Sequence, residues 1–277
     1  MNERTSLGGA DGLAVPPCAS SPMSENERSS LNLELISAWC GPAFAIGLVI
    51  FFGIFGFNLP SPPSPALGAE AIAARINDNL GNMRVGWVVA LLVMSLYMPW
   101  TAQIGTQLAR LERHSHTMTN LQLIGGALTV FVMCFGMVCW ATATFRPEID
   151  PVVLRMLIDM GWLGIELQWI LTTMQMVAMA LVGLSDKRKT PLFPRWVCFL
   201  SIWCSLSFAP ASLTMFLKTG PFAWDGVLSY YLPWAAWLIW CLVVSGYMVR
   251  DVMRRMPLAD DAVDRRVRAH SWTETSL

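Results

Sequence analysis

Residues 119–142 read TNLQLIGGALTVFVMCFGMVCWAT, a run of 24 residues in which no side chain carries a charge. The hydrocarbon core of a bilayer is about 30 Å thick, and a helix of about 20 apolar residues crosses it. We therefore predict that this run forms a transmembrane helix. Gly125 and Gly126 within it favour close contact with a neighbouring helix.

Five further stretches are of similar length and apolar character, and the composition of the whole chain agrees with them. They are residues 35–57, 85–106, 161–184, 196–217 and 227–249. Hydrophobic residues make up 55% of the chain and charged residues 14%, whereas about 25% of residues are charged in soluble domains. The sequence therefore predicts an all-α, polytopic transmembrane helix bundle with six spans, which occupies residues 34–250.

The distribution of lysine and arginine predicts which side of the membrane each end occupies. Basic residues are retained on the cytoplasmic side. With a cytoplasmic amino terminus, 14 of the 19 basic residues fall inside and five fall outside. We therefore expect both termini in the cytoplasm, with a disordered tail at residues 1–33 and a second tail at residues 251–277. The expected location is the bacterial inner (plasma) membrane.

Seven tryptophans lie near the predicted ends of the spans. Indole rings prefer the headgroup level of a bilayer, so we expect these side chains at the two membrane surfaces. They are Trp39, Trp87, Trp100, Trp140, Trp162, Trp196 and Trp224. Their positions agree with the six-span count.

Two of the predicted outer loops are long enough to hold short helices. In the first, Ile72, Ile76 and Leu80 repeat every four residues, which is typical of an amphipathic helix that lies on the outer leaflet or caps the bundle. The second contains Asp150, a favourable N-cap residue, directly before Pro151, which suits the first position of a helix. We expect this second helix to run into the fourth span.

The positions of the histidines exclude several classes of membrane protein. His114, His116 and His270 all lie outside the predicted spans. Haem held by two histidines, di-iron sites and intramembrane zinc sites need imidazole groups at membrane depth. We therefore expect no metal and no cofactor. The formal net charge is zero, so no global field favours a nucleic acid partner.

Glu166 is the one carboxylate inside the predicted spans, and ionisable groups at such positions are functional candidates. At spacings of three and four residues it shares a face of the fourth helix with aromatic and polar side chains. The fifth and sixth spans carry comparable stripes. If these three faces converge, they enclose an outward-facing aromatic pocket with the carboxylate at its mouth. The candidate ligand-binding residues are Asp159, Trp162, Glu166, Trp169, Thr173, Tyr230, Trp234 and Trp237. The alternative is ordinary packing between membrane helices.

Three functions are compatible with this pattern. The first is binding or transport of a small apolar or amphipathic molecule through the aromatic pocket. The second is an accessory subunit whose outer amphipathic helices dock on a membrane protein partner. The third is an intramembrane enzyme that acts on a lipidic substrate, with Glu166 or Asp159 as general acid or base. The lack of histidine in the spans argues against the enzyme, and no catalytic residue is assigned. Membrane lipid is an expected partner in every case.

Overall fold

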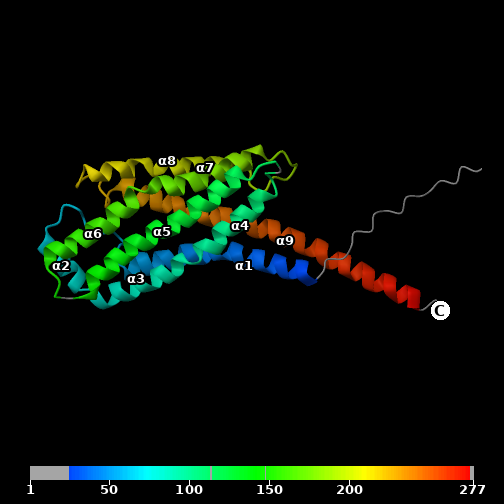
Figure 1. The fold of residues 1–277 in the computed structure, drawn as a ribbon, viewed down its shortest axis with the longest axis horizontal. Helices are drawn as coiled ribbons and strands as arrows, with labels where there is room; N and C mark the ends of the chain where they lie inside the picture. The colour runs from blue at the N-terminus through cyan, green and yellow to red at the C-terminus, as the bar shows by residue number, and fades with distance from the viewer. Residues whose placement is uncertain (1–24, 113, 147, 275–277) are drawn as a thin grey trace, which may run out of the picture.

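The fold comes from a computed structural model, which describes residues 25–112, 114–146 and 148–274, with side chains described up to Met256. Every regular element in these ranges is a helix, and the helices form one elongated bundle (Figure 1). Within them, six helical stretches are long and apolar enough to cross a membrane: Glu25–Phe55, Leu80–Ala109, Thr117–Phe145, Pro151–Ser185, Arg195–Met215 and Val227–Met256. The predicted all-α class and the six predicted spans are confirmed.

The first and last helices extend beyond the predicted spans. Helix α1 (Glu25–Gly47) begins nine residues before residue 34, so residues 25–33 are helical where we expected a disordered tail. Acidic side chains at Glu25 and Glu27 suit the first turn of a helix. Helix α9 (Leu232–Glu274) continues through the predicted carboxyl-terminal tail. The rest of the predicted amino-terminal tail, residues 1–24, lies outside the described residues.

Five of the seven tryptophans expected at the membrane surfaces are buried inside the bundle. They are Trp87, Trp100, Trp140, Trp162 and Trp224, whereas Trp39 and Trp196 are exposed. The expectation was wrong for these five because an indole ring also fills gaps between helices and can find a hydrogen-bond acceptor there. Trp100 illustrates this, since its Nε1 donates to Ser245 Oγ at 2.8 Å.

Two spans are interrupted where a proline removes a backbone donor. The second span consists of α3 (Leu80–Met94) and α4 (Tyr97–Ala109), and the break between them lies just before Pro99. The sixth span begins with a π-helical turn, η3 (Val227–Tyr231), shortly before Pro233. Proline cannot donate to the carbonyl four residues earlier, so the helix deforms on its amino-terminal side.

Two further deviations affect the fifth and first spans. Helix α8 (Arg195–Ser207) gives way to a 3₁₀ helix, η2 (Ala209–Met215), at Pro210. Helix α1 continues as a second π-helical turn, η1 (Leu48–Phe55). A π-turn has a wider backbone than an α-turn and is frequent at functional sites.

The fourth span is a pair of helices, α6 (Pro151–Glu166) and α7 (Trp169–Ser185). The predicted start of α6 is confirmed, because Asp150 Oδ1 accepts a hydrogen bond from the backbone nitrogen of Val152 at 2.8 Å and proline occupies the first turn. As expected, α6 runs from the loop into the span. It ends at Glu166, and two residues separate it from α7.

Helix α5 (Thr117–Phe145) lies at the centre of the bundle, packed against α3, α4, α6 and α7 (Figure 1). The predicted close contact at Gly125 is confirmed. A Cβ atom there would lie 2.8 Å from the nitrogen of Gln175 and 2.9 Å from the carbonyl oxygen of Leu171, so a larger residue would push α5 and α7 apart. Helix α9 packs against α1 and α8.

Different loops and helix ends lie at the two ends of the bundle. The start of α1, the α4–α5 turn, the α7–α8 loop and the extension of α9 lie at one end (Figure 1). Helix α2 (Ala69–Asn77) and the start of α6 lie at the other end. Ile72 and Ile76 of α2 are buried, and α2 packs against α6 and α3. The membrane side on which each end lies stays a prediction.

Candidate functional site

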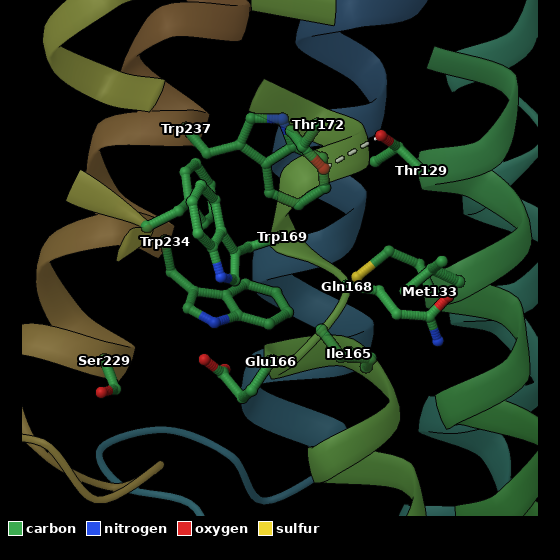
Figure 2. Close-up of a pocket in the computed structure, with 12 residues that line it drawn as sticks. Thr129, Met133, Ile165, Glu166, Gln168, Trp169, Thr172, Ser229, Trp234 and Trp237 are labelled. Carbon is green, nitrogen blue, oxygen red and sulfur yellow. Dashed lines mark hydrogen bonds between the residues drawn. The ribbon is translucent and has the colours of Figure 1, made fainter. Parts of the chain in front are cut away.

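The break between α6 and α7 adjoins a cavity enclosed by α5, α7, α9 and the segment after α8. Glu166 is the last residue of α6 and Trp169 is the first residue of α7. In the break, Gln168 Nε2 donates to the carbonyl of Gly164 at 2.8 Å. We call the cavity the Glu166 chamber (Figure 2). It is lined by Thr129, Val132, Met133, Ile165, Glu166, Gln168, Trp169, Thr172, Phe208, Ser229, Trp234 and Trp237.

Glu166 is the one acidic side chain in the lining of this chamber, and it is 4% exposed. Figure 2 shows its carboxylate pointing toward Ser229, with the ring of Trp234 beside it. Among the residues that the structure describes, no lysine or arginine forms an ion pair with it. A buried carboxyl group is costly unless a donor or a cation meets it. The side chain of Trp234 hydrogen-bonds to this carboxyl group and meets part of the need. A cation or a further donor on a bound molecule can meet the rest.

Most of the other polar groups in the wall are already satisfied by neighbours. The hydroxyls of Thr129 and Thr172 are hydrogen-bonded to each other at 2.9 Å, as Figure 2 shows. Trp169 Nε1 donates to Ser212 Oγ at 2.8 Å. The hydroxyl of Ser229 donates to a backbone carbonyl at 3.0 Å. Because these donors are hydrogen-bonded within the protein, the carboxyl group of Glu166 is the polar group in the lining best placed to bind a ligand.

The Glu166 chamber is small. Its volume is about 30 Å³, enough for one or two water molecules or for one small polar group. A larger ligand therefore needs a second space for the rest of its structure.

An apolar groove adjoins the chamber through Trp234. The groove has a volume of about 160 Å³ and runs between the two π-helical turns. Its lining is Leu48, Val49, Phe52, Gly53, Leu59, Tyr230, Tyr231, Trp234, Ala235 and Leu238. The ring of Trp234 stacks on Phe52, with centroids 4.9 Å apart and planes within 4°. Because Trp234 lines both spaces, one side chain forms a wall of each.

The structure brings together part of the predicted set. Glu166, Trp169, Trp234 and Trp237 line the chamber, and Tyr230 lines the groove. The predicted single face of the fourth helix is interrupted, because α6 ends at Glu166 and α7 begins again at Trp169.

The remaining three predicted residues lie outside both spaces. Trp162 is buried in an aromatic cluster, with its ring 4.9 Å from Trp140. Thr173 Oγ1 donates to the carbonyl of Ser205 at 3.3 Å, which ties α7 to α8. Asp159 lines neither the chamber nor the groove.

The structure contains a second buried carboxylate, which the sequence did not indicate. Glu34 lies one residue outside the first predicted span, yet it is 8% exposed. It pairs with Arg110 at the end of α4 and with Arg255 Nη2 of α9 at 2.7 Å. Gln103 Nε2 also donates to it at 3.3 Å. These contacts join α1, α4 and α9 at the end of the bundle opposite α2.

Comparison with known proteins finds no match. No family model, curated protein or solved structure matches this chain.

Proposed function

We propose that the protein binds a small amphipathic molecule that carries an amine or another donor group. The polar group would occupy the Glu166 chamber, and the apolar part would occupy the adjoining groove. One observation carries this proposal: Glu166 is a buried carboxylate with no ionic partner among the described residues, and one side chain, Trp234, separates its chamber from an apolar groove.

The aromatic walls favour a cationic polar group. Trp169, Trp234 and Trp237 line the chamber together with Glu166. The faces of indole rings attract cations, and a carboxylate among aromatic rings is a favourable site for an ammonium group. A ligand that reaches both spaces displaces the ring of Trp234 from its stack on Phe52. Trp234 would then act as a gate between the two spaces.

The proposal extends to location and transport. With both termini in the cytoplasm of a bacterial cell, α2 and the start of α6 face outward. The chamber, at the end of α6, then lies on the outer half of the bundle. A binding site at that depth suits uptake or release of an amphiphile from the outer leaflet.

The same geometry favours an enzyme with acid–base chemistry less than it favours a binding protein. A pair of carboxyl groups at one site would suit such chemistry, but Asp159 lies outside the chamber that contains Glu166.

Thermal unfolding of the purified full-length protein tests the proposal. The probe is dimethyloctylamine, and 1-octanol at the same concentration serves as its neutral counterpart. We expect the amine to raise the melting temperature by several degrees more than the alcohol, because a ligand at about 100 times its Kd stabilises the folded state by about 2.7 kcal/mol.

Two variants separate the chamber from other carboxylates. Glu166→Gln is expected to remove the excess effect of the amine. Glu70→Gln makes the same chemical change on the exposed face of α2 and is expected to retain it. Equal stabilisation of wild type and Glu166→Gln by the amine would contradict the proposal.

A further inference from the structure

A third cavity lies between α9 and the loop that joins α7 to α8, at the end of the bundle where α1 begins (Figure 1). Its volume is about 400 Å³. Four arginines line it, namely Arg188, Arg250, Arg254 and Arg255, against a single carboxylate, Asp251. We call it the basic cavity. Its charge is the opposite of that in the Glu166 chamber.

Two of these arginines form ion pairs with carboxylates of the protein. Arg255 pairs with Glu34 at 2.7 Å and with Asp251 at 3.0 Å. Arg188 pairs with Asp186 at 2.7 Å. Their charges are largely compensated within the protein.

The other two arginines are not compensated. Arg250 and Arg254 are exposed, and neither forms an ion pair with any residue whose side chain the structure describes. They stand four residues apart on α9, so they project from the same face of the helix. The cavity therefore presents two adjacent guanidinium groups, which can bind a phosphate by paired hydrogen bonds.

The loop that forms the opposite wall is fixed by Asp186. Its carboxylate accepts hydrogen bonds from the backbone nitrogens of Arg188 and Leu192, each at 3.1 Å, and from the guanidinium of Arg188. Partial burial raises the pKa of Asp186, but these hydrogen bonds outweigh it and hold the pKa below its usual value. The loop is thus ordered before any ligand arrives.

The same cavity has an apolar side. Pro191, Leu192, Pro194 and Tyr247 contribute to its lining. Trp196 is 52% exposed and packs edge-on against Tyr247, with ring centroids 6.0 Å apart. An exposed indole ring at the end of a span is typical of the headgroup level of a bilayer. The cavity therefore meets the membrane where phosphate groups are found.

We propose that the basic cavity binds the phosphate headgroup of an anionic phospholipid. Arg250 and Arg254 bind the phosphate, and the apolar side contacts the glycerol and upper chain. Basic pockets between membrane helices are suited to such headgroups. A free phosphate ion would use the arginines alone, whereas a lipid uses both sides of the cavity. This proposal does not depend on the function proposed for the Glu166 chamber.

The test measures lipid binding to the purified full-length protein by native mass spectrometry. Phosphatidylglycerol is titrated against phosphatidylcholine, and sodium phosphate is added in a separate arm. We expect phosphatidylglycerol to bind in preference to phosphatidylcholine. Raising the salt concentration should weaken that preference, because exposed charges are screened.

A double variant, Arg250→Gln with Arg254→Gln, is expected to bind phosphatidylglycerol about 30-fold more weakly, at about 1 kcal/mol for each arginine. Arg146→Gln with Arg155→Gln removes the same charge at the opposite end of the bundle and is expected to leave binding unchanged. The proposal would be overturned if the two lipids bind equally or if both double variants weaken binding equally. Displacement of the lipid by millimolar sodium phosphate would also overturn it.

Discussion

Replacing Glu34 by glutamine is expected to lower the free energy of unfolding by about 2–3 kcal/mol. The carboxylate accepts hydrogen bonds from Arg110 and Arg255, and a hydrogen bond to a charged group contributes about 1.5–3 kcal/mol. Both guanidinium groups remain partly exposed, at 42% and 29%, so water recovers part of that loss when the carboxylate is removed. For this reason the estimate lies below the sum of the two contributions.

The measurement is reversible unfolding of the full-length protein in mixed micelles, followed by tryptophan fluorescence. Glu70→Gln, at an exposed position of α2, is the matched control and should change the free energy by less than about 0.5 kcal/mol. Adding Arg255→Gln to Glu34→Gln should cost less than the sum of the two single changes, because both remove the same contact. A loss below about 0.5 kcal/mol for Glu34→Gln, or strict additivity, would refute the reasoning.

Three further outcomes are expected. Gly125→Ala should lower the free energy of unfolding by about 1–3 kcal/mol, because the added Cβ would press on Gln175. Gly246 has open space around it, so Gly246→Ala should not lower this free energy. Equal effects of the two variants in chemical unfolding would contradict this prediction. Asp186→Asn should destabilise the protein by about 1–3 kcal/mol at pH 7. The folded-state pKa of Asp186 lies below its usual 3.8, so the stability difference between wild type and Asp186→Asn should shrink as the pH falls through the folded-state pKa. Thermal unfolding of both proteins at several pH values would check this. Ala235→Phe should fill the groove and weaken stabilisation by dimethyloctylamine, and an unchanged shift in melting temperature would count against the groove as the ligand site.

The spans were predictable because each depends on a local property of the sequence. A window of about 20 apolar residues is recognised without knowledge of its neighbours, and each of the six predicted windows overlaps one of the six apolar helical stretches. The cap at Asp150 was predictable for the same reason, since its acceptor and donor are two residues apart. The small residue at Gly125 indicated a close helix contact, although the sequence did not say with which helix.

The features that the sequence did not predict depend on distant contacts. Glu34 lies at the edge of a span, and only the approach of α4 and α9 buries it. Trp224 was expected at the membrane surface, but its Nε1 donates to the carbonyl of Pro63, 161 residues away, at 2.8 Å. For the candidate site, the helical spacing predicted that Glu166 and Trp169 belong to it. It gave no sign that the helix breaks between them or that π-helical turns line the adjoining groove.

Carbodiimide labelling tests most directly whether Glu166 is a buried carboxyl group that an amphiphile can reach. The purified protein is treated with dicyclohexylcarbodiimide, which reacts with carboxyl groups in apolar surroundings, and the modified residues are mapped by mass spectrometry. Labelling is predicted at Glu166, and an excess of dimethyloctylamine, a tertiary amine that cannot couple to the activated acid, is predicted to suppress it. An unmodified Glu166, or labelling that the amine leaves unchanged, would contradict the proposed site.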